Sequence, residues 1–500
     1  MTCVCVAQED PRLTARVEAR RPLRYGAGAA PALDRPAHVR AGSGLAWVRT
    51  PGGPRLAVVQ DDASFLALVE PPGGAVDGLA LPAGPDGARQ FDDLRGTKHL
   101  KLDLESCLTL DGPDGQVLLG LGSGSTEQRQ RVLVARGLDG PDPDLRLVDA
   151  RALYAALRAE AAFAGSELNL EGAAAQGQDV VLFQRGNGAP RGDLLPVDAS
   201  GRLDRAGLLA YLADPGRASP PPLREVRPWR LGAIDGVRLT FTDATTGPDG
   251  RLWFLAAAEG SPDTYRDGPV AGVVLGVIEV ARGVTWARWS RLAHEGQPWS
   301  AKAEGLALDP RDPSRVWLVV DRDDPAAAAE LCAVRLAGPW APTRPRRGVV
   351  RVVSGGQTGA DRGALQAAQD LGLAHGGWCP RGRLAEDGVI DARWALLETP
   401  GADPAERTRS NVELADATVV FTAGPARGGS ALTLAHARAR GRPALHVDLA
   451  GSHHEAAAAD EVGRWLEVTR PATLNVAGCR ESEAAGLGAR VRRVLQAALV

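Results

Sequence analysis

The sequence predicts a multidomain protein: an N-terminal all-β propeller of five or six blades, followed by a C-terminal α/β Rossmann-like domain with a parallel sheet. The chain has 500 residues, more than one hydrophobic core normally serves. Similar short apolar runs recur about every 60–70 residues over roughly the first two-thirds of the chain, a spacing typical of repeat folds. After a segment rich in proline and arginine, strands alternate with helices, which indicates a parallel sheet with crossover helices.

Five apolar runs define the repeat. Each begins after a turn, continues as a buried-type strand and ends in polar residues or glycine: 55–62 (RLAVVQDD), 116–125 (QVLLGLGSGS), 179–188 (DVVLFQRGNG), 251–260 (RLWFLAAAEG) and 315–324 (RVWLVVDRDD). Apolar runs without alternation fit strands that are buried on both faces, as inner propeller strands are. Residues 13–23 do alternate, and we expect them to close the last blade. Residues 149–162 predict a helix between blades.

The proline-rich segment places the domain boundary. We predict a propeller at residues 1–338, a linker at 339–347 and the α/β domain at 348–500. Strands are expected at 349–353, 417–423, 443–449 and 473–477, and helices at 362–371, 431–440, 455–466 and 483–498.

Three strand-to-helix loops of this second domain share glycine and neutral hydrogen-bond donors. In a parallel sheet they leave the same edge, where ligands of open α/β folds bind. Glycine lets the backbone approach an anion, and the free N–H groups of a helix start favour negative charge. The predicted ligand-binding residues of these loops are Ser354, Gly355, Gly356, Gln357, Thr358, Gly359, Asp361, Gly428, Gly429, Ser430, Thr433, Asn475, Gly478 and Arg480.

Two further stretches are expected to line the same cleft. Residues 375–383 (HGGWCPRGR) combine glycine with Arg381, and Arg407 and Asn411 lie four apart on one face of a predicted helix. The alternative for Arg407 is a solvated surface charge.

Charge and composition exclude several classes of function. The formal net charge is −3 and no long basic run occurs, so neither nucleic acid nor an anionic membrane is an expected partner. No apolar stretch approaches the ~18 residues of a membrane span, and the N-terminus does not read as a signal peptide. Six scattered cysteines do not form a disulfide framework. We expect a cytoplasmic protein.

Acidic residues at recurring positions raise the question of a metal in the propeller. Glu171 (LNLEG) and Glu304 (KAEGLAL) recur at similar places in two repeats. Carboxylates that converge on a propeller axis can bind Ca²⁺. The alternative is that acidic residues end strands because turns favour them.

The C-terminal motifs carry a family resemblance. In order, SGGQTGADRGAL, HGGWCPRGRLAEDG, LLET, RTRSNVELAD, GGSALTLAHA and LNVAGCRES extend over residues 349–500. They resemble the molybdenum carrier protein family, a Rossmann-like branch of the superfamily that includes the LOG proteins. The propeller region loosely resembles phytase-like and other bacterial propellers. The hydrolytic LOG proteins carry PGGxGTxxE, whereas this chain has ARGGSALTLAHA and no acidic residue at the position of the catalytic glutamate.

The resemblance implies a ligand-binding domain without assigned catalytic residues. The expected ligand is small and phosphorylated, either the molybdenum cofactor or another phosphorylated nucleotide, and the propeller is a platform or accessory module. Two alternatives remain open. One is an enzyme or sensor that acts on nucleotide-derived signals such as ADP-ribose, and the other is a propeller phosphoesterase whose C-terminal domain recruits substrate. Assembly into a homo-oligomer through the Rossmann-like domain is a further hypothesis.

Overall fold

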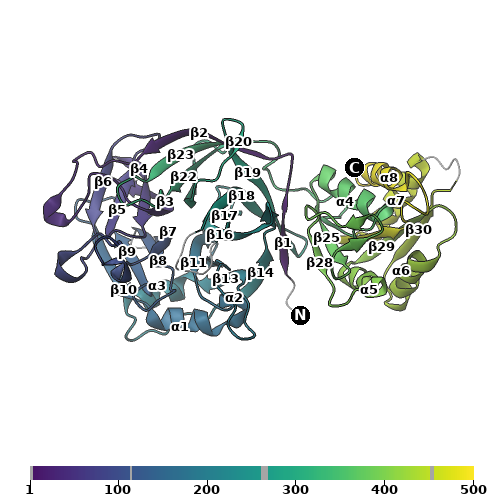
Figure 1. Ribbon diagram of the computed structural model, residues 1–500, viewed down its shortest axis with the longest axis horizontal. Coiled ribbons are helices and arrows are strands. Elements are labelled where there is room, and N and C mark those ends of the chain that lie inside the picture. Colours follow the sequence, from purple (N-terminus) through teal and green to yellow (C-terminus); the bar gives the residue numbers. More distant parts are fainter. Residues whose placement is uncertain (1–3, 113–114, 261–267, 451–454) are drawn as a thin grey trace. The chain divides into compact units, whose positions relative to one another are not determined.

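A computed structural model describes residues 4–112, 115–260, 268–450 and 455–500 (Figure 1). The chain divides into two compact units, the first formed mainly by Pro11–Ile278 and Trp289–Trp340 and the second mainly by Ala341–Val500. The bounds 1–338, 339–347 and 348–500 stay a prediction. Among the described residues, no helix is both long and apolar enough to cross a bilayer.

The first unit is a β-propeller, as predicted. Its described residues form five four-stranded blades around one axis (Figure 1). The first two are β3 (Gly42–Thr50), β4 (Gly53–Gln60), β5 (Phe65–Val69) and β6 (Val76–Ala80), then β7 (Leu104–Gly112), β8 (Gly115–Gly122), β9 (Arg131–Arg136) and β10 (Asp144–Asp149). The next two are β11 (Leu170–Gln176), β12 (Asp179–Gln184), β13 (Asp198–Asp204) and β14 (Arg224–Arg230), then β16 (Val237–Thr246), β17 (Leu252–Glu259), β18 (Val270–Ala281) and β19 (Val284–His294). The fifth is β21 (Ala303–Leu308), β22 (Arg315–Val320), β23 (Glu330–Ala337) and β2 (Thr14–Pro22).

The fifth blade joins the two ends of the propeller sequence. β2 pairs antiparallel with β23, from Thr14 opposite Ala337 to Pro22 opposite Glu330. Residues 13–23 therefore supply the closing outer strand, as the alternating pattern predicted. A shared blade removes the open sheet edge that each end would otherwise present.

The propeller core is divided among the interfaces between neighbouring blades. In β8, Leu118 packs in the cluster shared with the first blade, whereas Leu119 packs in the cluster shared with the third. Val58 and Val59 of β4 are divided in the same way. Successive side chains of a strand point to opposite faces, so both faces are apolar and the run does not alternate.

A few short elements pair with blade strands or lie between them. They are the strands β1 (Cys5–Glu9), β15 (Ala233–Ile234) and β20 (Gln297–Pro298), the helices α1 (Arg151–Ala159), α2 (Ala161–Ala164) and α3 (Arg205–Ala213), and three 3-10 turns at Pro31–Leu33, Pro85–Gly87 and Lys98–Leu100. α1 and α2 follow the last strand of the second blade and confirm the helix expected at 149–162. α1 buries Leu153, Tyr154 and Leu157 against that blade and the next.

The second unit contains a six-stranded sheet in the order β28-β25-β24-β31-β29-β30, and every pairing is parallel. Its strands are β24 (Arg351–Val353), β25 (Ala374–Cys379), β28 (Leu396–Glu398), β29 (Ala417–Thr422), β30 (Ala444–Asp448) and β31 (Thr473–Gly478). A small hairpin, β26 (Leu384–Ala385) and β27 (Gly388–Val389), precedes β28. This is the predicted α/β Rossmann-like domain.

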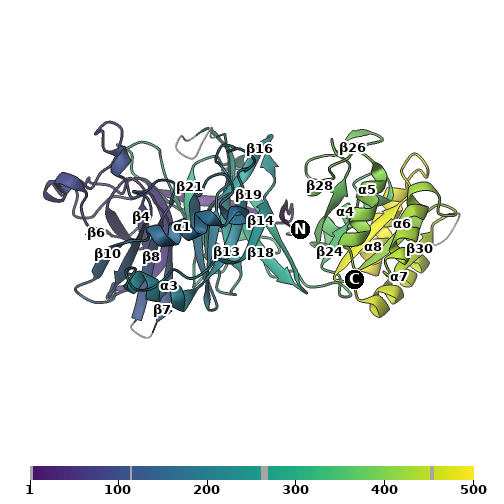
Figure 2. The same ribbon diagram turned by 90° about the horizontal axis from the view of Figure 1, so that it is seen from below.

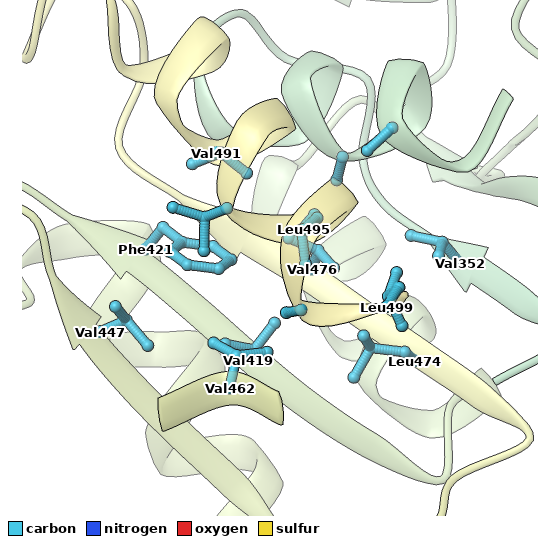
Figure 3. Packing of buried hydrophobic residues seen from close by; sticks show 14 of the residues in the cluster. Val352, Val419, Phe421, Val447, Val462, Leu474, Val476, Val491, Leu495 and Leu499 are labelled. Carbon is cyan, nitrogen blue, oxygen red and sulfur yellow. The ribbon is translucent and has the colours of Figure 1, made fainter. Parts of the chain in front are cut away.

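Helices cover both faces of this sheet (Figure 2). They are α4 (Ala360–Leu371), α5 (Pro404–Leu414), α6 (Gly428–Ala439), α7 (Glu455–Thr469) and α8 (Leu487–Ala498). α4, α7 and α8 bury their apolar sides against alternate residues of the central strands, as Figure 3 shows for Val419, Phe421, Leu474 and Val476. α5 and α6 contact each other and cover the opposite face.

The segment 375–379 belongs to a stretch that the sequence predicts to line the cleft, and it lies within the sheet. It forms most of β25, a strand paired on both sides, and the imidazole of His375 is buried. Consecutive glycines normally indicate a turn. At Gly377, however, a Cβ would meet Asn411 Oδ1 at 2.7 Å, so glycine is needed here for close packing inside the sheet.

Candidate functional site

The candidate site lies at the carboxyl edge of the parallel sheet. β24, β31 and β29 are neighbours, so the loops that follow Val353, Gly478 and Thr422 leave the sheet side by side. Two of these loops lead directly into α4 and α6. The three predicted loops therefore do share one edge, which is where a ligand can meet several helix starts at once.

A pocket of about 350 Å³ opens among these loops. Eight of the predicted residues line it: Gln357, Asp361, Arg407, Gly429, Ser430, Thr433, Gly478 and Arg480. Eight further residues that the sequence did not single out as binding residues also line it: Asp403, Pro404, Ala405, Thr408, Arg427, Leu432, Ala477 and Glu483.

The start of α5 is the part of the pocket that sequence reasoning missed. Asp403 is the N-cap of α5, where its carboxylate accepts a hydrogen bond from Ala405 N at 2.9 Å, and Pro404 is the first helical residue. An aspartate followed by proline is a recognisable helix start. That signal could have located the segment, although not its position beside the other loops.

Three predicted polar residues hold the loops together and do not line the pocket. Ser354 Oγ donates to Val476 O at 2.6 Å, which joins the first loop to β31. The side chain of Asn411 makes two hydrogen bonds to the backbone of Trp378: its Oδ1 accepts from Trp378 N at 2.7 Å, and its Nδ2 donates to Trp378 O at 2.9 Å. Asn475 is buried in β31. These side chains position the binding edge from within.

Three other predicted donors have internal acceptors. The Thr358 hydroxyl donates to Glu386 of the β26–β27 hairpin, and the Thr433 hydroxyl donates to Gly429 O at 2.9 Å. Arg381 is exposed and outside the pocket, although its backbone N–H donates to Gly401 O at 3.0 Å. Of these three, only Thr433 touches the pocket.

The glycines of the loops fall into two groups. A Cβ at Gly356, Gly359 or Gly478 would overlap neighbouring atoms of the domain, so these positions are needed for packing. Nothing lies within 4 Å of a Cβ built at Gly428 or Gly429. The open backbone of the site is therefore at the start of α6.

The start of α6 offers backbone donors. Arg427 is the N-cap and makes no side-chain capping hydrogen bond. Its carbonyl accepts from Ser430 N at 3.0 Å and Ala431 N at 3.3 Å, whereas Gly428 and Gly429 precede the first residue that an intrahelical carbonyl can reach. Because the helix dipole is positive at this end, the two N–H groups favour an anion.

An ion pair forms one wall of the pocket. Arg407 Nη1 lies 3.1 Å from Asp361 Oδ2, and only 4% of the Asp361 side chain is exposed. Burial raises the pKa of Asp361, although Arg407 and the Gln357 N–H oppose the rise. Arg407 therefore lines the pocket as a largely buried cation, and it is not a solvated surface charge.

Two other arginines that line the pocket are exposed to solvent. Arg427 and Arg480 are exposed. Within the ranges that the structure describes, neither guanidinium takes part in an ion pair within 4 Å. Exposed guanidinium groups beside free backbone N–H groups are suited to phosphate oxygens.

The propeller has a repeated polar feature at its axis. All five innermost strands contain a register shift near their start, between Gly42 and Gly44 in the first blade and between the equivalent residues of the others. The residues inside these shifts are Ser43, Glu105, Glu171, Thr242 and Glu304. Glu171 and Glu304 therefore occupy equivalent positions.

Resident cations neutralise these carboxylates. Arg185 Nη1 lies 3.3 Å from Glu171 Oε1, and Lys302 Nζ lies 3.2 Å from Glu304 Oε1. Burial raises the pKa of Glu171 to about 7. Calcium binding by Glu171 and Glu304 stays a prediction.

Another group of carboxylates has the spacing that a metal requires. The oxygens of Asp61, Asp103 and Glu105 lie within 4.8 Å of one another. Lys101 Nζ, however, is 2.9 Å from Asp61 and 2.6 Å from Asp103. An ammonium group thus already pairs with two of these three carboxylates.

Two family models match the chain. The family of unknown function DUF6929 matches residues 38–336, and the circularly permutated YpsA SLOG family matches residues 352–499. No curated protein matches this chain.

Three solved structures are among those that match parts of this chain. A protein from Syntrophus aciditrophicus SB, whose name describes it as a molybdenum carrier, is 36% identical over 31% of this chain and 97% of its own, with a TM-score of 0.30. A luciferin-regenerating enzyme is 10% identical over 64% of this chain and 95% of its own (TM-score 0.31). The GH93 α-L-arabinofuranosidase of Fusarium graminearum is 8% identical over 64% and 98% (TM-score 0.29).

Proposed function

We propose that this chain, which belongs to the DUF6929 family of unknown function, binds a small phosphate-bearing ligand in the pocket of its SLOG-like C-terminal domain. The observation that carries the proposal is the open start of α6. There nothing lies within 4 Å of a Cβ built at Gly428 or Gly429, and the exposed side chains of Arg427 and Arg480 line the same pocket as Gly429. A phosphate at this place receives backbone hydrogen bonds and two charge-assisted contacts.

The carboxylates of the pocket support binding rather than catalysis. Asp361 is paired with Arg407, Asp403 caps α5, and Glu483 accepts from Arg480 N at 3.0 Å. Each has at least one structural partner within the domain. A general acid or base needs a carboxyl group that is free to exchange its proton with the substrate.

The ligand that we favour is the molybdenum cofactor or a phosphorylated nucleotide. Either ligand would bind through its phosphate. No cysteine or histidine is among the residues described as lining the pocket, so the residues present would hold the phosphate-bearing part of the molybdenum cofactor and not ligate the metal. A sensor or enzyme for ADP-ribose-like signals is the alternative, and it uses the same phosphate contacts.

The propeller phosphoesterase alternative is less well supported. A propeller pocket of about 280 Å³ is lined by seven aspartates and two lysines. Without a bound cation, such a surface repels a phosphate ester. We therefore propose the propeller as a platform or accessory module.

Calorimetry of the full chain with AMP, ADP-ribose and molybdopterin tests the proposal. Gly429→Leu places a side chain in the open space above α6, and we expect at least about a tenfold loss of affinity because backbone hydrogen bonds to a charged group are lost. Ala435→Leu adds the same side chain at an exposed position of the same helix and is the matched control. The proposal is wrong if no phosphate compound binds, or if Gly429→Leu binds as tightly as the control.

A further inference from the structure

The charges of the C-terminal pocket are balanced. Three arginines and three acidic residues line it, and Asp361 and Arg407 neutralise each other at 3.1 Å. This leaves Arg427 and Arg480 opposed by Asp403 and Glu483. Two guanidinium groups can neutralise one phosphate monoester, but a second phosphate in the pocket would lie close to a carboxylate.

The two remaining carboxylates need hydrogen-bond donors. Asp403 uses one oxygen to cap α5, and Glu483 Oε2 accepts from the backbone of Arg480. A carboxylate has about four acceptor sites, so both retain acceptor capacity toward the pocket. Hydroxyl or amino groups of a ligand can use it, whereas further anionic groups cannot.

The pocket also lacks a surface on which a ring could stack. Among its described lining residues none is aromatic, and its apolar contribution comes from small or aliphatic side chains such as Pro404, Leu432 and Ala477. Proteins that recognise a nucleobase by its face usually stack it on an aromatic side chain or on a guanidinium plane. In the proposed binding mode, both exposed guanidinium groups contact the phosphate and are not available for stacking.

We infer that the pocket recognises the phosphate monoester and the adjacent hydroxylated carbons of its ligand, as in a sugar phosphate, and not a nucleobase or a second phosphate. This inference rests on the proposed function and names the substrate class of the same site. A nucleoside monophosphate binds through its ribose phosphate, and its base contributes little. A pyrophosphate is disfavoured by Asp403 and Glu483.

Calorimetry of the full chain with inorganic phosphate, ribose 5-phosphate, AMP and ADP tests the inference. Ribose 5-phosphate and AMP should bind within about threefold of each other, and inorganic phosphate and ADP at least about tenfold more weakly, since one lost charge-assisted hydrogen bond or one like-charge contact costs that much. AMP binding more than tenfold tighter than ribose 5-phosphate, or ADP binding as tightly as AMP, overturns the inference. If neither phosphate nor any ester binds, the proposed function itself fails.

Charge-removing variants test the role of the two carboxylates. Asp403→Asn retains a good helix cap, and Glu483→Gln retains an acceptor for Arg480 N. We expect each to narrow the preference of AMP over ADP by about three- to tenfold, because a repulsive charge is removed. Glu461→Gln, on the exposed side of α7, removes a negative charge away from the pocket, and we expect it to leave the ratio of AMP to ADP affinity unchanged. An unchanged AMP-to-ADP ratio in both pocket variants overturns the charge argument.

Discussion

Replacement of Gly355 by alanine should displace a charged side chain from the site without distorting the loop. Gly355 does not have a positive φ, so alanine can adopt its backbone conformation. A Cβ there would overlap the guanidinium of Arg407, and it would also lie 2.8 Å from Asp361 Oδ2. The guanidinium is the flexible end of a long side chain and can move away at little steric cost.

The energetic cost comes from the partner that remains. Without Arg407, the buried carboxylate of Asp361 keeps the Gln357 N–H at 3.3 Å but no cation. Removal of one partner of a fully buried ion pair costs roughly 3–5 kcal/mol. The Arg407 side chain is 15% exposed, so solvent screens part of the interaction, and we expect a loss of about 2 kcal/mol.

The measurement is hydrogen exchange by mass spectrometry on the full chain across a urea series, read on peptides from α4 and α5. Gly355→Ala is compared in two backgrounds, wild type and Asp361→Asn. We expect Gly355→Ala to lower the free energy of unfolding by about 2 kcal/mol in the wild-type background. In the Asp361→Asn background we expect almost no loss, because that variant has no carboxylate that could lose its cation. Equal losses in both backgrounds would show a steric cause, and no loss in either would refute the role of the ion pair.

Two further predictions concern buried titratable groups. Burial lowers the pKa of His375 to about 4. The contribution of the neutral imidazole to the free energy of unfolding is therefore fully present above the unfolded pKa of about 6.5. It is lost as the pH falls through about 4, by on the order of 3 kcal/mol. Exchange of β25 amides at pH 7 and 4.5 checks this, and an undiminished pH dependence in His375→Phe contradicts it. In the propeller, Arg185 contacts Glu171 and Glu259, and its side chain is 4% exposed. Arg185→Leu should lower the free energy of unfolding by about 3–5 kcal/mol at pH 8 and by less at pH 5.5, because burial raises the pKa of Glu171 to about 7 and its carboxyl can then take up a proton. Urea midpoints at the two pH values test it, and a cost that does not depend on pH counts against the reasoning.

The sequence predicted the elements whose signals are local. Apolar runs without alternation indicated strands between two cores, and Leu118 and Leu119 do face different blade interfaces. The alternation in residues 13–23 predicted the closing strand β2. The glycine-rich loops were located because a strand followed by a helix fixes where each loop lies on a parallel sheet.

The residues that form the pocket could be predicted only in part. Gly356 and Gly429 look alike in the sequence, yet a side chain at Gly356 would collide with the packed interior, whereas Gly429 faces open space. Asn475 and Ser354 carry donors suited to an anion, but these donors make hydrogen bonds to other residues inside the domain.

By itself, then, the sequence determined the two fold classes and the edge of the sheet at which the candidate site lies. Burial and secondary structure follow from the periodicity of neighbouring residues, and that periodicity is present in the chain. Only the tertiary structure decided that the start of α5 joins the loops, that Arg407 is held by Asp361, and that Glu171 and Glu304 are neutralised by resident cations. Such pairings depend on distances between residues far apart in the chain, which no local pattern specifies.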